Sequence, residues 1–244
     1  MRTRSIFCGL VGAGLLAAAA PPQGHTVSPA GIKAQLESDP AMGETFQALK
    51  DDYPDEYERM VRLMVEGVGA NRSDAEMRQL GFDEMRRFVG SKLPVLVRAP
   101  SADLRAVALA YADVIHVLQR DDQGLCARFV TTGIRASDIF SPAAMKALSH
   151  VNALQLRAMR HAETSPGPAR GQLQQADAAA FTAAVARSNP AAMPLLQDQA
   201  KLNASSDADK CAVGVAIYDA ISSLPEDQAA ALAAALAINA PKGS

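Results

Sequence analysis

The sequence has 244 residues, of which 49% are hydrophobic and 20% charged, with 24 basic and 26 acidic side chains. This near balance argues against a nucleic-acid-binding protein, which needs a basic surface. Trp is absent, aromatic residues make up 5% of the chain and Ala is abundant, so we expect closely packed helices rather than a sheet, and no platform of stacked aromatic rings for sugars.

The first twenty residues are typical of an export signal. Arg2 and Arg4 precede an apolar run over residues 6–16, and small residues follow it. These small residues predict cleavage near Ala19, with a later cut after Ala30 as the alternative. An uncleaved membrane anchor is the competing interpretation, but the apolar run is shorter than the roughly 20 residues that span a bilayer. We therefore expect a periplasmic or secreted protein with no integral membrane domain after cleavage.

Cysteine content adds a second indication of export. Cleavage removes two Arg, no acid and Cys8, which leaves 22 basic against 26 acidic residues, a formal charge near −4, and the pair Cys126 and Cys211. In an oxidising compartment this pair is expected to form a disulfide, closing a loop of about 85 residues and contributing roughly 4 kcal/mol in the chain-entropy model. The alternative is two buried thiols that pack as small hydrophobic side chains.

Proline, serine and apolar spacing divide the region before residue 100 into helices. Residues 21–30 read as a flexible leader. Ser73 and Glu76 match a capping box, and Pro94 should kink or end the helix that they start. Helices are expected over residues 31–38, 40–52 and 54–69, and from residue 73 toward Pro94.

The most strongly patterned segment runs from Ser101 to Arg120. Apolar residues at helical spacing fill one face and much of the opposite face, so we expect a helix buried on more than one side, around which the others pack. Ser101 is expected to cap its free amides. Asp103 lies in the first turn, where the helix dipole favours an acid.

The second half of the chain is also predicted to be helical. Thr164 to Gly171 is the best linker candidate, since Pro and Gly fill four of its eight positions, and it is a candidate boundary within one helical domain over residues 31–244. No segment shows sustained period-two alternation, so we expect an all-α protein, a compact bundle of eight to ten helices. The expected elements are a short helix with Cys126, a long helix from Pro142 to about Glu163, a helix ending at Ser188, a proline-interrupted piece from Pro190 to Leu202, a helix capped by Ser206, and a last helix from Pro225 to Asn239.

No catalytic or metal-binding motif stands out, and no metal ion or cofactor is expected. The four histidines are His25, His116, His150 and His161. None has metal-ligand spacing, and no nucleophile motif is present. Asp113, His116 and Arg120 lie at helical spacing on the central helix and form one candidate polar site. A buried carboxylate there would make His116 an acid or base, whereas the alternative is a hydrogen-bonded patch at a helix-packing seam.

An acidic cluster brackets one expected helix start. Its members are Asp51, Asp52, Asp55, Glu56 and Glu58. Negative charge is favoured at a helix N-terminus, so a solvated helix end is one interpretation, and a surface that meets a basic patch on a partner is the other. The slight basic excess between Arg72 and Arg105 is interpreted as a mixed solvated face.

Three functions from different classes remain. An exported helical protein that binds another protein, as an adaptor, inhibitor or immunity-type factor, requires no catalytic motif, and helical bundles offer surfaces for it. A carrier would hold a lipid or small apolar ligand between helices. An envelope enzyme would assemble its active site from residues far apart in the sequence. The sequence favours protein binding and identifies no partner.

Overall fold

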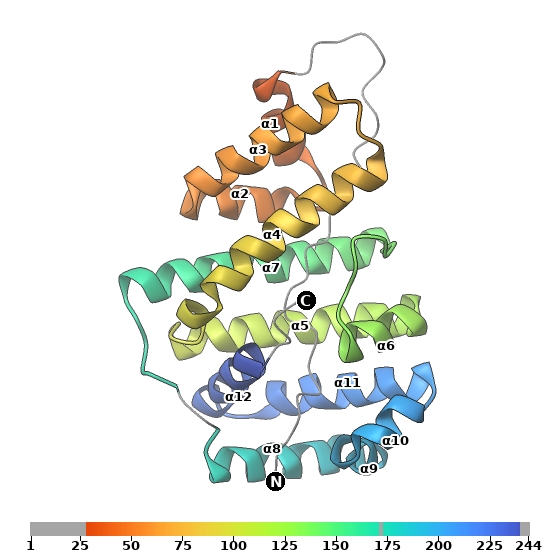
Figure 1. Cartoon of the computed structure of the whole chain (residues 1–244). Coiled ribbons are helices and arrows are strands. Elements are labelled where there is room, and N and C mark those ends of the chain that lie inside the picture. Colours follow the sequence, from red (N-terminus) through yellow and green to blue (C-terminus); the bar gives the residue numbers. More distant parts are fainter. Residues whose placement is uncertain (1–27, 171–172, 240–244) are drawn as a thin grey trace.

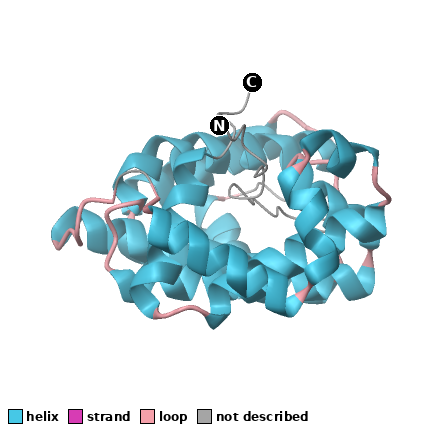
Figure 2. Ribbon diagram, turned by 90° about the horizontal axis from the view of Figure 1, so that it is seen from below, coloured by secondary structure: helices cyan, strands magenta, loops and turns pink. Residues whose placement is uncertain are grey.

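The computed structural model describes residues 28–170 and 173–239. Over these residues the chain forms twelve α-helices, one short 3-10 helix and no strand (Figure 2), which confirms the all-α prediction. The predicted export signal and the predicted cleavage near Ala19 lie outside the described residues, and the alternative cut after Ala30 would fall within α1. The helices are α1 (Pro29–Ser38), α2 (Gly43–Asp52), α3 (Pro54–Gly69), α4 (Asp74–Leu96), α5 (Ser101–Asp121), α6 (Gln123–Thr131), α7 (Pro142–Thr164), α8 (Gln175–Ser188), η1 (Pro190–Ala192), α9 (Met193–Gln197), α10 (Gln199–Ala204), α11 (Asp207–Ser223) and α12 (Glu226–Asn239).

The helix count exceeds the expected eight to ten because the proline-interrupted piece divides. Pro190 starts η1, and α9 ends where Asp198 takes an extended backbone conformation. The Asp198 carboxylate then accepts hydrogen bonds from the amides of Ala200 and Lys201 and so caps α10. One predicted piece is therefore two short α-helices that follow a 3-10 turn.

Two expected boundaries shift for local reasons. α1 begins at Pro29, inside the expected flexible leader, because the Ser28 hydroxyl accepts a hydrogen bond from the Gly31 amide and Pro suits the first helical position. α4 begins with the predicted capping box of Ser73 and Glu76, but it continues through Pro94 and ends two residues later.

The predicted central helix is α5. It contacts α6, α7, α11 and α12, and its Val114 and Ile115 are completely buried. In Figure 1, α7, α5, α11 and α8 lie as successive rows, and α2 packs on the far side of α7. The order of neighbours is thus α2, α7, α5, α11, α8, with α5 in the middle of the stack.

The prediction that Ser101 caps α5 is wrong. Ser101 is the first residue of the helix, and its hydroxyl donates to Asp227 Oδ1 at 2.7 Å and accepts from Arg170 Nη2 at 2.8 Å. These charged partners come from α12 and from the linker candidate, and hydrogen bonds to charged groups are stronger than one to a backbone amide.

The linker candidate is bound to the start of α5. Arg170 Nη1 donates to the Ala99 carbonyl at 2.6 Å, and the Gly167 amide donates to the Arg98 carbonyl at 2.7 Å. A Cβ at Gly167 would lie 2.9 Å from the Ala99 oxygen, so this approach requires glycine. The Pro- and Gly-rich composition here serves a close backbone contact.

The predicted disulfide is present. Cys126 and Cys211 are both buried and join α6 to α11 across 85 residues of sequence. The two helices also approach closely at Gly214, where a Cβ would lie 2.1 Å from Cγ2 of Val130 and 2.5 Å from Cδ1 of Ile115. The close approach at Gly214 and the disulfide together fix α6 and α5 against α11.

Candidate functional site

Three of the five acids in the acidic cluster have a side-chain partner within the chain. Glu56 lies 2.8 Å from Arg87 Nη2 and 3.4 Å from Arg59 Nε, while Glu58 pairs with Lys33. Asp51 accepts a hydrogen bond from Gln47 at 2.8 Å. These contacts hold α1, α3 and α4 together.

Asp52 and Asp55 complete the cluster. Asp52 is half-buried, and burial raises the pKa of its carboxyl, opposed by the nearby charge of Arg157 and Arg160 on α7. Asp55 is exposed in the first turn of α3, where the helix dipole favours it. The five acids therefore offer less free negative charge than their number in the sequence indicates.

The candidate polar site on α5 is not brought together as expected. His116 Nε2 lies 2.8 Å from Asp219 Oδ1 on α11, so its carboxylate partner is Asp219 in place of Asp113. Asp113 is exposed, which removes the buried carboxylate that the catalytic interpretation required, and Arg120 pairs with its neighbour Asp121. Asp219 lies 103 residues further along the chain, and no local sequence signal links it to His116.

The other described histidines follow the same arrangement. His150 Nδ1 on α7 lies 3.1 Å from Glu44 on α2, and His161 Nδ1 on α7 lies 2.8 Å from Asp103 on α5. With the His116 pair, each of the interfaces α2–α7, α7–α5 and α5–α11 carries one histidine–carboxylate bridge. The three histidines are at separate interfaces, so no two of them share a site. His25 lies outside the described residues.

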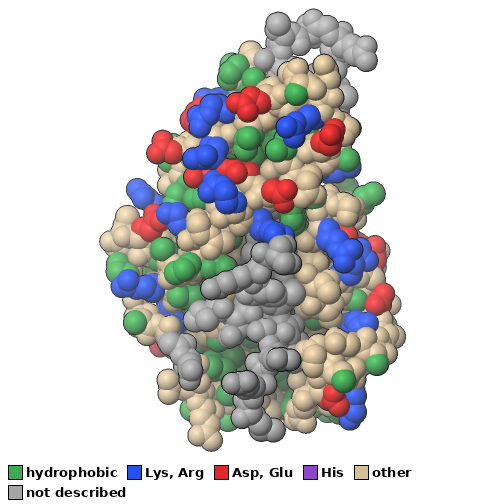
Figure 3. Space-filling view, in the orientation of Figure 1, with side chains coloured by type: hydrophobic (Ala, Val, Ile, Leu, Met, Phe, Trp, Pro, Cys, Tyr) green, Lys and Arg blue, Asp and Glu red, His purple; other side chains and the backbone are tan. Residues whose placement is uncertain are grey.

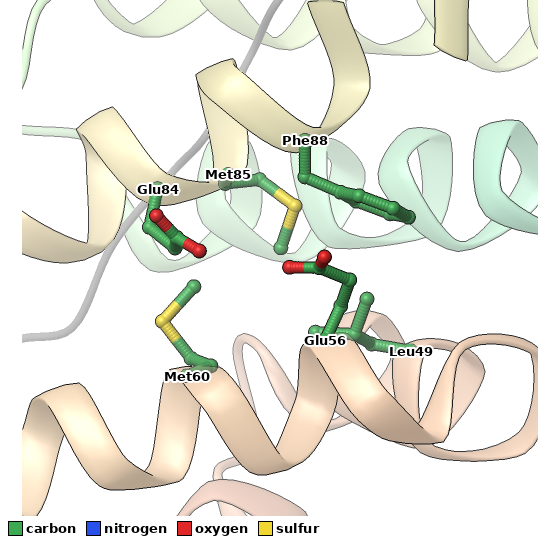
Figure 4. Close-up of a pocket in the computed structure, with 6 residues that line it drawn as sticks. All are labelled: Leu49, Glu56, Met60, Glu84, Met85 and Phe88. Atoms are coloured by element: carbon green, nitrogen blue, oxygen red, sulfur yellow. The ribbon is translucent and has the colours of Figure 1, made fainter. Parts of the chain in front are cut away.

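A shallow depression lies between α3 and α4. Figure 4 shows its lining, with Glu56 and Glu84 on facing helices and the side chains of Met60, Met85, Phe88 and Leu49 around them. The space of about 160 Å³ between its walls includes open solvent, and none of it is an internal cavity that could hold a water molecule. A hydrogen bond from Arg87 lowers the pKa of Glu84. The depression is the seam of two helices joined by ion pairs, and it gives no support to the carrier hypothesis.

The α6–α7 loop, residues 132–141, carries a feature that the sequence did not single out. Ile139 is 88% exposed, and among the described residues it is the one large hydrophobic residue that is not at least partly buried. Its loop neighbours face the other way, since Ile134 is buried and Phe140 is half-buried against the core. The loop thus directs one isoleucine into solvent between two apolar anchors.

Polar contacts fix this loop at its start, middle and end. Gly133 closes α6 with a positive φ of 78°, and its amide donates to the Arg128 carbonyl at 2.9 Å. Asp138, whose side chain is 7% exposed, accepts from Arg128 Nη2 at 3.1 Å and from the Arg135 amide at 2.8 Å. Ser141 caps α7 and donates to Asp121 Oδ2 at 2.6 Å.

The sequence contained part of this information. Gly133, Asp138 and the Ser141–Pro142 pair are turn and cap signals, which place Ile139 in a loop. Whether an apolar loop residue faces the core or the solvent depends on tertiary packing, and the sequence alone could not decide it.

Metal-binding clusters, membrane-spanning helices and known relatives were each sought, the first two among the described residues. Within residues 28–170 and 173–239, no group of three or more His, Cys, Asp or Glu side chains is placed to hold a metal ion. None of the helices described there combines the length and the apolarity needed to span a bilayer. Comparison with protein-family models, with curated proteins and with solved structures finds no match.

Proposed function

We propose that this chain is an exported protein that acts by binding another protein, as an adaptor, inhibitor or immunity-type factor, and that the partner docks on the α6–α7 loop. Export is supported by the signal-like first twenty residues and by the Cys126–Cys211 disulfide, since disulfides persist mainly in oxidising compartments. The mature location would be the periplasm or the medium.

The observation that carries the docking site is the fixed, exposed Ile139. A single exposed apolar side chain is ordinary on a protein surface. Here, however, Asp138, Gly133 and Ser141 hold the backbone around it, so a partner pays little ordering entropy when it binds. Complete burial of an isoleucine side chain contributes about 1.5–3 kcal/mol, which corresponds to roughly 10- to 100-fold in affinity.

The expected partner surface, Asp51 to Glu58, has weaker support. Arg59, Arg87 and Lys33 already neutralise two of its five acids, Glu56 and Glu58, so a basic partner would have to displace these cations to pair with those two. Each exposed ion pair contributes little free energy, and exchanging one such pair for another with a partner gives no net gain in binding free energy. A basic peptide that binds over residues 51–58 would favour this surface over the loop.

Site-specific photo-crosslinking tests the proposal. A photoreactive residue is placed at position 139 and, as matched controls, at the exposed positions Glu66 on α3 and Arg187 on α8. We expect one envelope protein to crosslink at position 139 and at neither control, and to form a stoichiometric complex when purified and mixed with this chain. Equal labelling at all three positions, or reconstitution that survives Ile139→Ser unchanged, would contradict the docking site.

A further inference from the structure

The α6–α7 loop also carries a local charge that points to the chemistry of the partner. Arg135 and Lys146 are exposed, and neither forms an ion pair with an acidic side chain of the described residues. The nearby acids are engaged, because Asp138 accepts from Arg128 and Asp121 pairs with Arg120 and Ser141. A chain of formal net charge −2 thus has a local positive excess at this loop.

The two cations come before and after Ile139 in the sequence, Arg135 in the same loop and Lys146 near the start of α7. The Asp138 amide donates to the Arg135 carbonyl at 3.0 Å, so residues 135–138 form a turn directly before Ile139. Lys146 is in the second turn of α7, and side chains on a helix lean toward its N-terminus, here toward the end of the loop. Residues 135–146 thus hold the exposed isoleucine, two exposed cations and one acid, Asp138, that Arg128 already engages.

We infer that the partner presents an apolar pocket rimmed by carboxylates, which receives Ile139 while its acids face Arg135 and Lys146. This inference rests on the proposed function. Charge complementarity at the rim steers encounter and excludes wrong partners, and an apolar centre supplies affinity. A second copy of this chain is disfavoured at the same face, since a two-fold contact would bring the two pairs of cations together.

Two defined peptides test this chemistry on the intact mature protein. Each is an amphipathic helix of about 16 residues with Leu along one face, and the remaining positions are Glu in one peptide and Lys in the other. Binding is followed by fluorescence anisotropy of labelled peptide, and the contacted residues are mapped by amide NMR shifts.

The expected result is binding of the Leu/Glu peptide with shifts concentrated at residues 133–147. The double variant Arg135→Glu/Lys146→Glu should weaken it about 10-fold or more, and raising NaCl from about 50 to 300 mM should weaken wild-type binding roughly 3- to 10-fold. The variant Arg187→Glu is the charge-matched control, since Arg187 is exposed on α8, and it should bind as wild type does. Melting curves confirm that each variant is folded.

The remaining outcomes separate the two proposals. Equal binding of both peptides that is lost in Ile139→Ser would overturn the acidic rim and leave the docking loop standing. Absence of peptide binding at the loop would also overturn the acidic rim, and photo-crosslinking at position 139 would then decide whether the proposed function fails with it. Binding of the Leu/Lys peptide with shifts over residues 51–58 would move the partner surface to the acidic cluster.

Discussion

The N-terminal region, α1–α7, and the C-terminal region, α8–α12, are stabilised in different ways. The first packs Tyr, Phe and Met side chains and joins its helices by ion pairs such as Glu56–Arg87, Lys92–Glu163 and Glu44–Arg157. Within the C-terminal region, the ion pairs between described residues are Lys201–Asp198 and Lys210–Asp207, and the partners of each are only three residues apart. On the face in Figure 3, charged side chains of both signs are interspersed over the upper part, where α1–α4 lie.

The C-terminal region uses small and branched side chains instead. Its apolar cluster consists mainly of Ala, Val, Ile and Leu, with Ala108 of α5 joining from the other region. Ala229, Ala230 and Ala234 of α12 are completely buried, which lets helices approach closely. Flexible Met and long charged side chains adapt to a change, whereas close contact between small residues does not. The same substitution should therefore have different effects in the two regions.

The largest effect is expected from removing the disulfide, which ties α6 of the first region to α11 of the second. The double variant Cys126→Ala/Cys211→Ala should lower the free energy of unfolding by about 2–5 kcal/mol, through the lost cross-link on an 85-residue separation. Guanidinium denaturation measures it. Reduction of the wild-type protein should give a similar loss, and a loss below about 1 kcal/mol in both would show that the two regions do not depend on this bond.

A matched pair of glycine variants compares branched with flexible neighbours, at the contact of α11 with α6 and α5 and within the N-terminal region. Gly214→Ala places a Cβ 2.1 Å from Cγ2 of the branched Val130 and should lower stability by about 1–3 kcal/mol. Gly67→Ala places its Cβ 2.3 Å from Sδ of the flexible Met77 and should change stability by less than about 1 kcal/mol, because Met can move and Ala favours helix.

Gly90→Ala is the control for these variants, since nothing lies within 4 Å of the added atom. It should stabilise the protein by about 0.5–1 kcal/mol through helix propensity alone. Denaturation midpoints with an unchanged denaturant slope measure all three. Equal losses for Gly214→Ala and Gly67→Ala would contradict the proposed difference in packing.

The smallest effect concerns acid and the ion pairs of the N-terminal region. A hydrogen bond from Arg87 lowers the pKa of Glu84, so its contribution to stability is present above the ordinary Glu value of about 4.3 and is lost as the pH falls through the lowered value. Glu84→Gln should remove this part of the pH dependence, below about 1 kcal/mol in size. Unfolding curves between pH 7 and 3 measure it, with Glu66→Gln as an exposed control; identical pH profiles for the two variants would refute the role of Glu84.

What the sequence could predict was local. The capping box at Ser73, the apolar periodicity of α5 and the isolated cysteine pair each report on neighbouring residues or on a compartment, and the structure confirms all three. Apart from the disulfide, which joins residues 85 apart, contacts between distant segments were missed. Ser101 binds Arg170 and Asp227 rather than its own helix, and His116 meets Asp219 rather than Asp113, because tertiary packing chooses partners that sequence spacing does not reveal.

The candidate site shows the same division. The sequence identified the acids from Asp51 to Glu58 by their density, but their pairing with Arg59, Arg87 and Lys33 arises only when α1, α3 and α4 pack. Conversely, an isoleucine in a loop carries no sequence signal of its own. Its exposure depends on Ile134 and Phe140 turning inward on either side.

The most direct test of the central claim is the affinity of the purified partner for wild-type protein and for Ile139→Ser, with Ile139→Val as the conservative control. If the α6–α7 loop is the docking site, Ile139→Ser should weaken binding roughly 10- to 100-fold, and Ile139→Val by only a few fold, without a change in melting temperature. Equal affinities for all three proteins would contradict docking at this loop.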